Sequence, residues 1–309
     1  MEIENIEDFK EKYDNHIQNI VFPEVMKFEK ERKIRLTLVN LTILICSLIL
    51  ISSPVLLNST SHEWLQYIIA TSFVALISVK QLTKKNFEEK VKTMVMPIIM
   101  KSIPGFRWQE PPITRKDMIK CKILPPEKMK DYSYEDGFIG KYKNINIAIS
   151  EYYTNKNSTN NFSQGVIVKF DMNKNFNGNT VIRPRDAFNV SSEADLKLNN
   201  MEKIDLEDPN FNEKFFVYST DPIEARYLLT PAFMERLYAT SNAFNSKAEY
   251  CSFYENSIYI VLDTGEDMFD LCDLNTPMDD KEQYNVLYNE LASILDLIDY
   301  FKLDQKLGL

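Results

Sequence analysis

Two carboxylates and an arginine stand close together in the stretch FFVYSTDPIEARYLLTPAFMERL. Asp221 and Glu224 are of the type that transfers protons or holds a metal ion, and Arg226 is of the type that binds a phosphate or a carboxylate. Asp136 and Arg183, upstream in the chain, would complete a polar pocket if the fold brought them alongside. The candidates for catalysis are therefore Asp136, Asp221, Glu224 and Arg226, and the candidates for ligand binding are Arg183 and Arg226.

The same stretch also has the pattern of a helix start. Asp221 precedes Pro222, and Glu224 follows the aspartate by three residues, which is the arrangement of an N-cap, a proline in the first turn and a capping box. Thr230, also followed by a proline, repeats the pattern for a second helix. Catalysis needs a partly buried site with shifted pKa values, which spacing alone does not show. We therefore expect Asp221 to cap a helix and assign no catalytic residue.

Composition argues against several classes of function. The net charge of -9 argues against a nucleic-acid-binding protein, which would carry a basic surface. The 7 glycines form neither of the Gly-rich phosphate-binding motifs, and the 2 histidines lie far in the sequence from the candidate residues. The 4 cysteines are widely spaced and lack a C-x-x-C motif, so we expect free thiols in a reducing compartment. We expect neither a metal nor a cofactor.

Two apolar segments near the N-terminus predict a membrane anchor. The segment LTLVNLTILICSLILISSPVLL, residues 36–57, carries no charge and is long enough to span a bilayer as a helix. The segment WLQYIIATSFVALISV is shorter, and its flanking residues complete a second span over about residues 62–81. A hairpin buried within protein is the alternative for the second segment. Lys and Arg residues flank the pair on both sides and are absent from the loop NSTSHE, so we expect two spans with both termini cytoplasmic.

The segments next to the two spans are charged and have helical periodicity. They read FKEKYDNHIQNIVFPEVMKFEKERK before the first span and KKNFEEKVKTMVMPIIMKSI after the second. Pro23 and Pro97 should kink or break these helices. Two arrangements fit: an antiparallel stalk that continues the hairpin, or two helices on the bilayer surface, where their lysines meet anionic lipid. With the spans, these segments form a helical membrane-anchor region over residues 1–101.

Residues 102–309 predict a cytoplasmic α+β domain. Alternation of apolar and polar residues predicts a hairpin that turns at Lys143–Asn144 and a last hairpin that turns at Glu255–Asn256. An amphipathic helix over residues 284–301 follows. Strands paired in hairpins, with helices grouped between and after them, indicate an antiparallel sheet with helices on one side. Arg183 would then be a solvated charge at the sheet edge.

The motif S-x-D-x-x-E-A-R-Y-L-L-T-P, which begins at Ser219, resembles the bacterial domain-of-unknown-function 3137 family. The stretches YEDGFIGKYKNINIAISE and KFDMNKNFNGNTVIRP upstream extend the resemblance. It implies the same organisation as in that family: a cytoplasmic helix, two spans, and a domain built around the strand before the motif. It also implies a bacterial source and a location in the cytoplasmic membrane, and it brings no activity, cofactor or catalytic residue.

Two kinds of function fit this sequence. In the first, the membrane-anchored α+β domain binds a protein, a lipid headgroup or a small ligand at the membrane surface. Its partners would be the bilayer and either another protein or a second copy of the chain, without nucleic acid. In the second, the chain is a membrane-proximal enzyme that uses the carboxylate and arginine cluster around Asp221. We favour the binding module, because no nucleophile–base pair accompanies the carboxylates.

Overall fold

The structure, a computed structural model, divides into two compact units. The sheet unit comprises residues 1–10, 103–269 and 287–309, and the helical unit comprises residues 11–102 and 270–286. The expected division at residues 101 and 102 did not include the segment 270–286 in the helical unit. The described residues are 6–59, 63–124, 132–154, 164–172, 174–187, 194, 196–197, 199–243 and 246–303.

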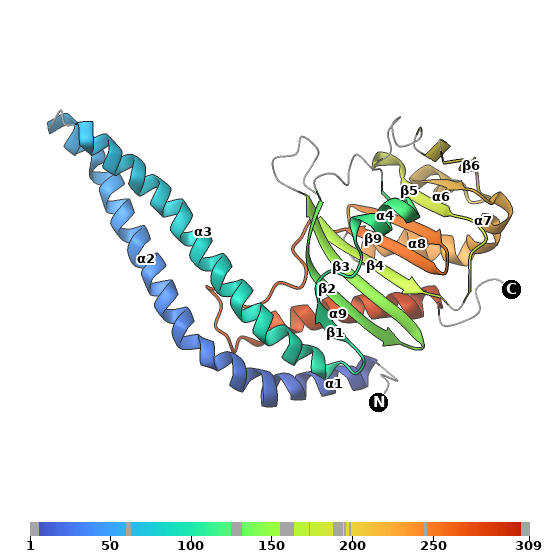
Figure 1. The fold of residues 1–309 in the computed structure, drawn as a ribbon, viewed down its shortest axis with the longest axis horizontal. Helices are drawn as coiled ribbons and strands as arrows, with labels where there is room; N and C mark the ends of the chain where they lie inside the picture. Colours follow the sequence, from blue (N-terminus) through green and yellow to red (C-terminus); the bar gives the residue numbers. More distant parts are fainter. Residues whose placement is uncertain are drawn as a thin grey trace. The chain divides into compact units, whose positions relative to one another are not determined.

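The helical unit is built around two long antiparallel helices (Figure 1). Pro23 does not break the helix. A π-helical segment precedes it, and α2 begins one residue before it, at Phe22. A wider turn fits here because proline has no N–H and its ring crowds the carbonyl four residues earlier. Pro97 lies inside α3 near its end. The elements of this region are α1 (Ile6–His16), whose first residues belong to the sheet unit, the π-helix Ile17–Val21, α2 (Phe22–Ser59), α3 (Glu63–Ile99) and the 3-10 turn Met100–Ser102.

The charged halves of α2 and α3, which adjoin the predicted spans, pair along a row of apolar side chains. We call this pair of charged halves the stalk. Val25 of α2 and Phe87 and Val91 of α3 are fully buried. Across the pair, Lys90 Nζ donates to Glu31 Oε2 at 2.7 Å. Of the two predicted arrangements, the structure therefore has the antiparallel stalk.

A buried ion pair fastens the segment 270–286 to the stalk. Arg32 donates from Nε and Nη2 to the two carboxylate oxygens of Glu29, each at 2.8 Å, and from Nη1 to the Leu274 carbonyl, also at 2.8 Å. Glu29 Oε2 accepts from the Met278 N–H at 3.2 Å, and Glu88 accepts from the Leu274 N–H at 3.0 Å. The Arg32 hydrogen bonds hold the pKa of Glu29 at about 2. The two sides of this contact are far apart in sequence, so neither predicts it alone.

The described residues of both predicted spans are helical, as parts of α2 and α3. Among the residues that the structure describes, no helix combines the length and the apolar run needed to cross a membrane, and the transmembrane hairpin is not supported by this finding. Several side chains of the predicted spans lie outside the described part of the chain: Leu50 and residues 53–57 of the first, and residues 62–66, 75–77 and 80 of the second.

The sheet unit contains an antiparallel sheet of nine described strands, in the order β1-β2-β3-β4-β9-β8-β5-β7-β6. The predicted hairpins are confirmed. Lys143 and Asn144 have φ values of 45° and 65°, which is the left-handed turn geometry that joins two twisted strands in a two-residue hairpin. The strands are β1 (Arg107–Gln109), β2 (Tyr132–Tyr142), β3 (Ile145–Thr154), β4 (Gln164–Asp171), β5 (Thr180–Pro184), β6 (Glu202–Ile204), β7 (Phe215–Ser219), β8 (Ala248–Tyr254) and β9 (Ser257–Asp263).

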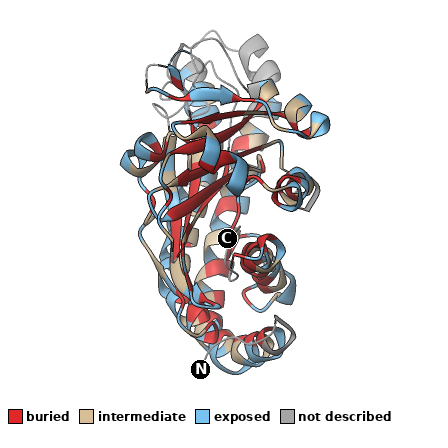
Figure 2. Ribbon diagram, turned by 90° about the vertical axis from the view of Figure 1, so that its right-hand side faces the viewer, coloured by how far each residue is buried: buried red, intermediate tan, exposed pale blue. Residues whose placement is uncertain are grey.

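Helices cover both faces of this sheet, whereas the sequence predicted helices on one side. In the central strands, five of the eight residues of β4 and six of the seven of β9 are buried, so both faces need cover. Figure 2 shows the strands of the sheet mostly in red, the colour of buried residues. Met118 of α4 packs in a cluster with Tyr250, while Phe233 of α8 packs against Phe253 with 5.4 Å between the centroids of the tilted rings. Tyr250 and Phe253 point to opposite faces because they are three positions apart on β8. The helices are α4 (Arg115–Cys121), the 3-10 turn Arg185–Ala187, α6 (Pro209–Lys214), α7 (Pro222–Leu228), α8 (Pro231–Ala243) and α9 (Lys281–Phe301), of which the residues before 287 belong to the helical unit.

Candidate functional site

Asp221 is the N-cap of α7. Its Oδ1 accepts hydrogen bonds from the Ile223 and Glu224 N–H groups, both at 3.0 Å, and its backbone is extended. Thr230 does the same for α8, since its Oγ1 accepts from the Phe233 N–H at 3.2 Å. The prediction that these residues cap two helices is confirmed.

Glu224 does not close the predicted capping box. The Asp221 N–H donates instead to Ser219 Oγ at 3.0 Å. The Glu224 side chain is buried and accepts through Oε2 from the N–H groups of Asn177 and Gly178, at 2.6 and 3.0 Å. Its carboxylate therefore stabilises the chain that leads into β5, because two backbone donors on one carboxylate oxygen make charge-assisted hydrogen bonds.

The two candidate arginines have different surroundings. Arg226 is exposed, and its Nη1 donates to the Pro222 carbonyl one turn earlier in α7, at 3.0 Å. Arg183 is 1% exposed, and its Nη2 donates to the Lys122 carbonyl. Because β5 lies between β8 and β7, Arg183 is inside the sheet, and the expectation of a solvated charge at its edge is wrong.

Asp136 lies on a different part of the sheet from Asp221. It is 1% exposed, and its Oδ1 accepts from the Trp108 indole N–H at 2.9 Å. Asp136 is on β2, the second strand in the order, and Asp221 follows β7, the eighth. Six strand spacings of about 4.8 Å put roughly 29 Å between those strands along the sheet. The structure therefore does not bring Asp136 into one pocket with Asp221 and Glu224.

The described side chains offer little for metal or thiol chemistry. No three His, Cys, Asp or Glu residues among them form a group that could hold a metal ion. The four cysteines are free, as the sequence predicted, and all are buried. Burial raises the pKa of the Cys121 and Cys272 thiols to about 12, so these thiols are protonated at neutral pH.

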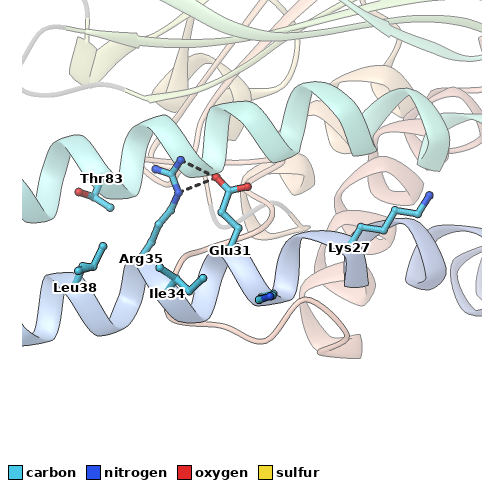
Figure 3. Close-up of a pocket in the computed structure, with 7 residues that line it drawn as sticks. Lys27, Glu31, Ile34, Arg35, Leu38 and Thr83 are labelled. Atoms are coloured by element: carbon cyan, nitrogen blue, oxygen red, sulfur yellow. Dashed lines mark hydrogen bonds and ion pairs between the residues drawn. The ribbon is translucent and has the colours of Figure 1, made fainter.

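A groove on the stalk is lined by both charged and apolar side chains (Figure 3). It is shallow and open, with a volume of about 590 Å³. Most of its lining comes from α2, and Thr83 comes from α3. We call it the stalk groove; its lining residues are Lys27, Lys30, Glu31, Ile34, Arg35, Leu38 and Thr83.

The stalk groove was not predicted from the sequence, although a signal for it was present. Its six residues on α2 are separated alternately by three residues and by one, the spacing that lines up side chains on one face of a helix. The same residues would also suit a charged helix face in contact with solvent. The neighbouring helix decides between a groove and a solvated face, because only packing against α3 turns the face into a groove.

Comparison with known proteins finds one family model that matches part of the chain. Residues 160–303 match the model of the family described as "Protein of unknown function (DUF3137)". This match supports the DUF3137 family for that region, which is slightly less than half of the chain. No curated protein matches the chain. Among solved structures, the chain is similar to the crystal structure of the mycobacterial trehalose monomycolate transport factor A, TtfA, with 10% identity, a TM-score of 0.30, and 56% of this chain and 77% of that chain covered.

The DUF3137 region confirms the resemblance drawn from the motif that begins at Ser219. It contains β4 to α9, and with them Arg183, Asp221, Glu224 and Arg226. Asp136 and the whole stalk groove lie outside the matched residues.

Proposed function

We propose that this chain is a bacterial binding protein anchored in the cytoplasmic membrane by the hairpin of α2 and α3. Both termini and the sheet unit would be cytoplasmic. In this proposal the hairpin crosses the bilayer twice, over about residues 36–57 and 62–81, and the chain binds its partner at the membrane surface.

The observation that carries the proposal is the set of large apolar side chains exposed on α2 and α3. Each is between 41% and 76% exposed, and each would stand in water if the hairpin were not covered. At about 1 kcal/mol for each half-exposed side chain, covering them is worth on the order of 10 kcal/mol, comparable to the whole stability of a domain. They are Leu38, Leu41, Leu44, Ile45, Leu48 and Ile51 on α2, and Tyr67, Ile68, Phe73 and Val74 on α3.

The length of the helices fits a hairpin that is only partly in the bilayer. The 38 residues of α2 and the 37 of α3 correspond to about 55 Å each, against a hydrocarbon core of about 30 Å. The surplus length is the charged stalk. Its lysines and arginines, with none in the loop at the tip, support a cytoplasmic position for the stalk.

The contacts around Asp221 favour a binding protein over an enzyme. Asp221 and Glu224 each accept from backbone N–H groups through one carboxylate oxygen, and Arg226 donates to a carbonyl of its own helix. These are the contacts of a rigid scaffold.

Extraction of membranes from cells that make the chain tests the anchor. We expect the native chain to stay in the membrane pellet at alkaline pH. The double variant Leu44→Arg/Leu48→Arg places two charges at the centre of the first span, at a cost of about 3 kcal/mol each, and should be released. The variant Met26→Arg is the matched control, since Met26 is 44% exposed on the stalk half of the same helix and should stay in the pellet. Release of the native chain itself would contradict the proposal.

A further inference from the structure

The side chains that line the stalk groove change from basic to apolar along its length. At one end are Lys27 and Lys30, and at the other are Ile34 and Leu38, which are 52% and 57% exposed. Lys27 and Leu38 are separated by about 16 Å along the helix axis. In Figure 3 the Lys27 and Leu38 side chains lie at opposite ends of the group.

The charge of the groove is positive. Lys27, Lys30 and Arg35 line it against one carboxylate, Glu31. Lys27 also forms an ion pair with Glu24, which is outside the lining, and this pair is largely exposed to solvent. Glu31 is already engaged, since it accepts from Arg35 Nη2 and Lys90 Nζ, each at 2.7 Å. Those hydrogen bonds, Lys90 first, lower the pKa of Glu31, so it stays ionised and its charge is balanced within the stalk. Lys30 makes no hydrogen bond or ion pair with any described residue, which leaves its ammonium available to an anion.

The apolar end of the groove coincides with the start of the first predicted span. Leu36 opens the uncharged segment, so Ile34 and Leu38 stand on either side of the expected boundary between water and hydrocarbon. A ligand that fits both ends has an anionic head and an apolar chain.

We propose that the stalk groove binds an acidic phospholipid. Its phosphate lies against the Lys27 and Lys30 ammonium groups, and the first part of an acyl chain lies along Ile34 and Leu38. Basic pockets on the cytoplasmic side of membrane helices bind lipid headgroups through this combination of charge and position. The inference rests on the membrane anchor of the proposed function. It adds the class of lipid that the chain binds and the residues that bind it.

The test uses the full chain in nanodiscs made of equal parts phosphatidylglycerol and phosphatidylcholine. Native mass spectrometry after release counts the lipids of each kind that stay bound. The groove variant is Lys27→Gln/Lys30→Gln. The matched control is Lys12→Gln/Lys85→Gln, which removes the same charge from two exposed lysines of the helical unit outside the groove.

We expect the native chain and the control to retain phosphatidylglycerol in excess, and the groove variant to lose most of that excess. A loss of about fivefold for each charge gives about 25-fold for the pair. Equal retention ratios in the groove variant and the control, or no excess in the native chain, would overturn the inference while leaving the anchor intact. A native chain that does not enter nanodiscs at all would contradict the anchor, and the inference with it.

Discussion

Replacement of Arg32 by methionine should release the segment 270–286 from the stalk. Methionine keeps much of the apolar stem of Arg32 and removes its guanidinium, which makes two hydrogen bonds to Glu29 and one to the Leu274 carbonyl. Glu29 is 8% exposed, so its carboxylate would remain buried with only the Met278 N–H and the more distant Lys33 ammonium at 3.4 Å. Breaking a buried ion pair in this way costs about 3–5 kcal/mol.

The same contact lowers the pKa of Glu29. The Arg32 hydrogen bonds are the largest cause that lowers it from 4.5 to about 2, with smaller contributions from the Met278 N–H and Lys33, and the whole difference corresponds to about 3 kcal/mol. Because the folded pKa is the lower one, this stabilisation is complete above about pH 4.5 and is lost as the pH falls toward 2. In the Arg32→Met variant the pKa should rise, and the loss should begin at a higher pH.

Hydrogen exchange at the Met278 amide measures the effect locally. Its N–H donates to Glu29, so its protection reports the attachment of the segment. A loss of about 3 kcal/mol predicts exchange roughly 100-fold faster in Arg32→Met. The control Lys33→Met removes a cation that also contacts Glu29 but is 68% exposed, so it should cost less than about 1 kcal/mol. Equal effects of the two variants on Met278 would refute the reasoning.

Three further predictions concern the capping, turn and buried acid of the two units. Asp221→Ala should lower the free energy of unfolding of the sheet unit by about 1 kcal/mol, measured by denaturant titration, because α7 loses its N-cap; unchanged stability would argue against the capping role. Asn144→Gly should raise that free energy by about 0.5 kcal/mol, since the turn needs a positive φ that glycine adopts without strain, and a lower value would contradict the assigned turn. Burial raises the pKa of Glu88 to about 7. Since the folded form then binds a proton more tightly than the unfolded form, the helical unit should lose on the order of 2 kcal/mol of stability as the pH rises from 4.5 to 7. Glu88→Gln should flatten that slope, and a native chain with no slope would show that Glu88 titrates normally.

The local elements of this fold could be predicted because their signals are local. A proline after Asp221, the threonine hydroxyl of Thr230 before a helix, and alternation on either side of Lys143–Asn144 each act over a few residues. The structure places all of these where the sequence indicated them.

The remaining features depend on partners that are far apart in the sequence. Glu224 had a local role available, in the capping box, but its carboxylate binds the N–H groups of residues 177 and 178 instead. Arg183 looked like an edge charge because sequence alone does not give the strand order, which puts β5 inside the sheet. The segment 270–286 joins the helical unit through Arg32, more than two hundred residues earlier. In each case the structure depends on a contact or a strand order that joins residues far apart in the sequence.

The most direct test of the membrane anchor is the accessibility of two introduced cysteines. All four native cysteines are buried, so the background reaction with a membrane-impermeant maleimide should be low. Asn58→Cys lies at the tip of the hairpin and Glu235→Cys on an exposed position of the sheet unit. In intact cells we predict that the cysteine introduced at position 58 is labelled and the one at position 235 is labelled only after permeabilisation. Labelling of both from outside, or of neither until the cells are opened, would contradict a hairpin that crosses the membrane twice.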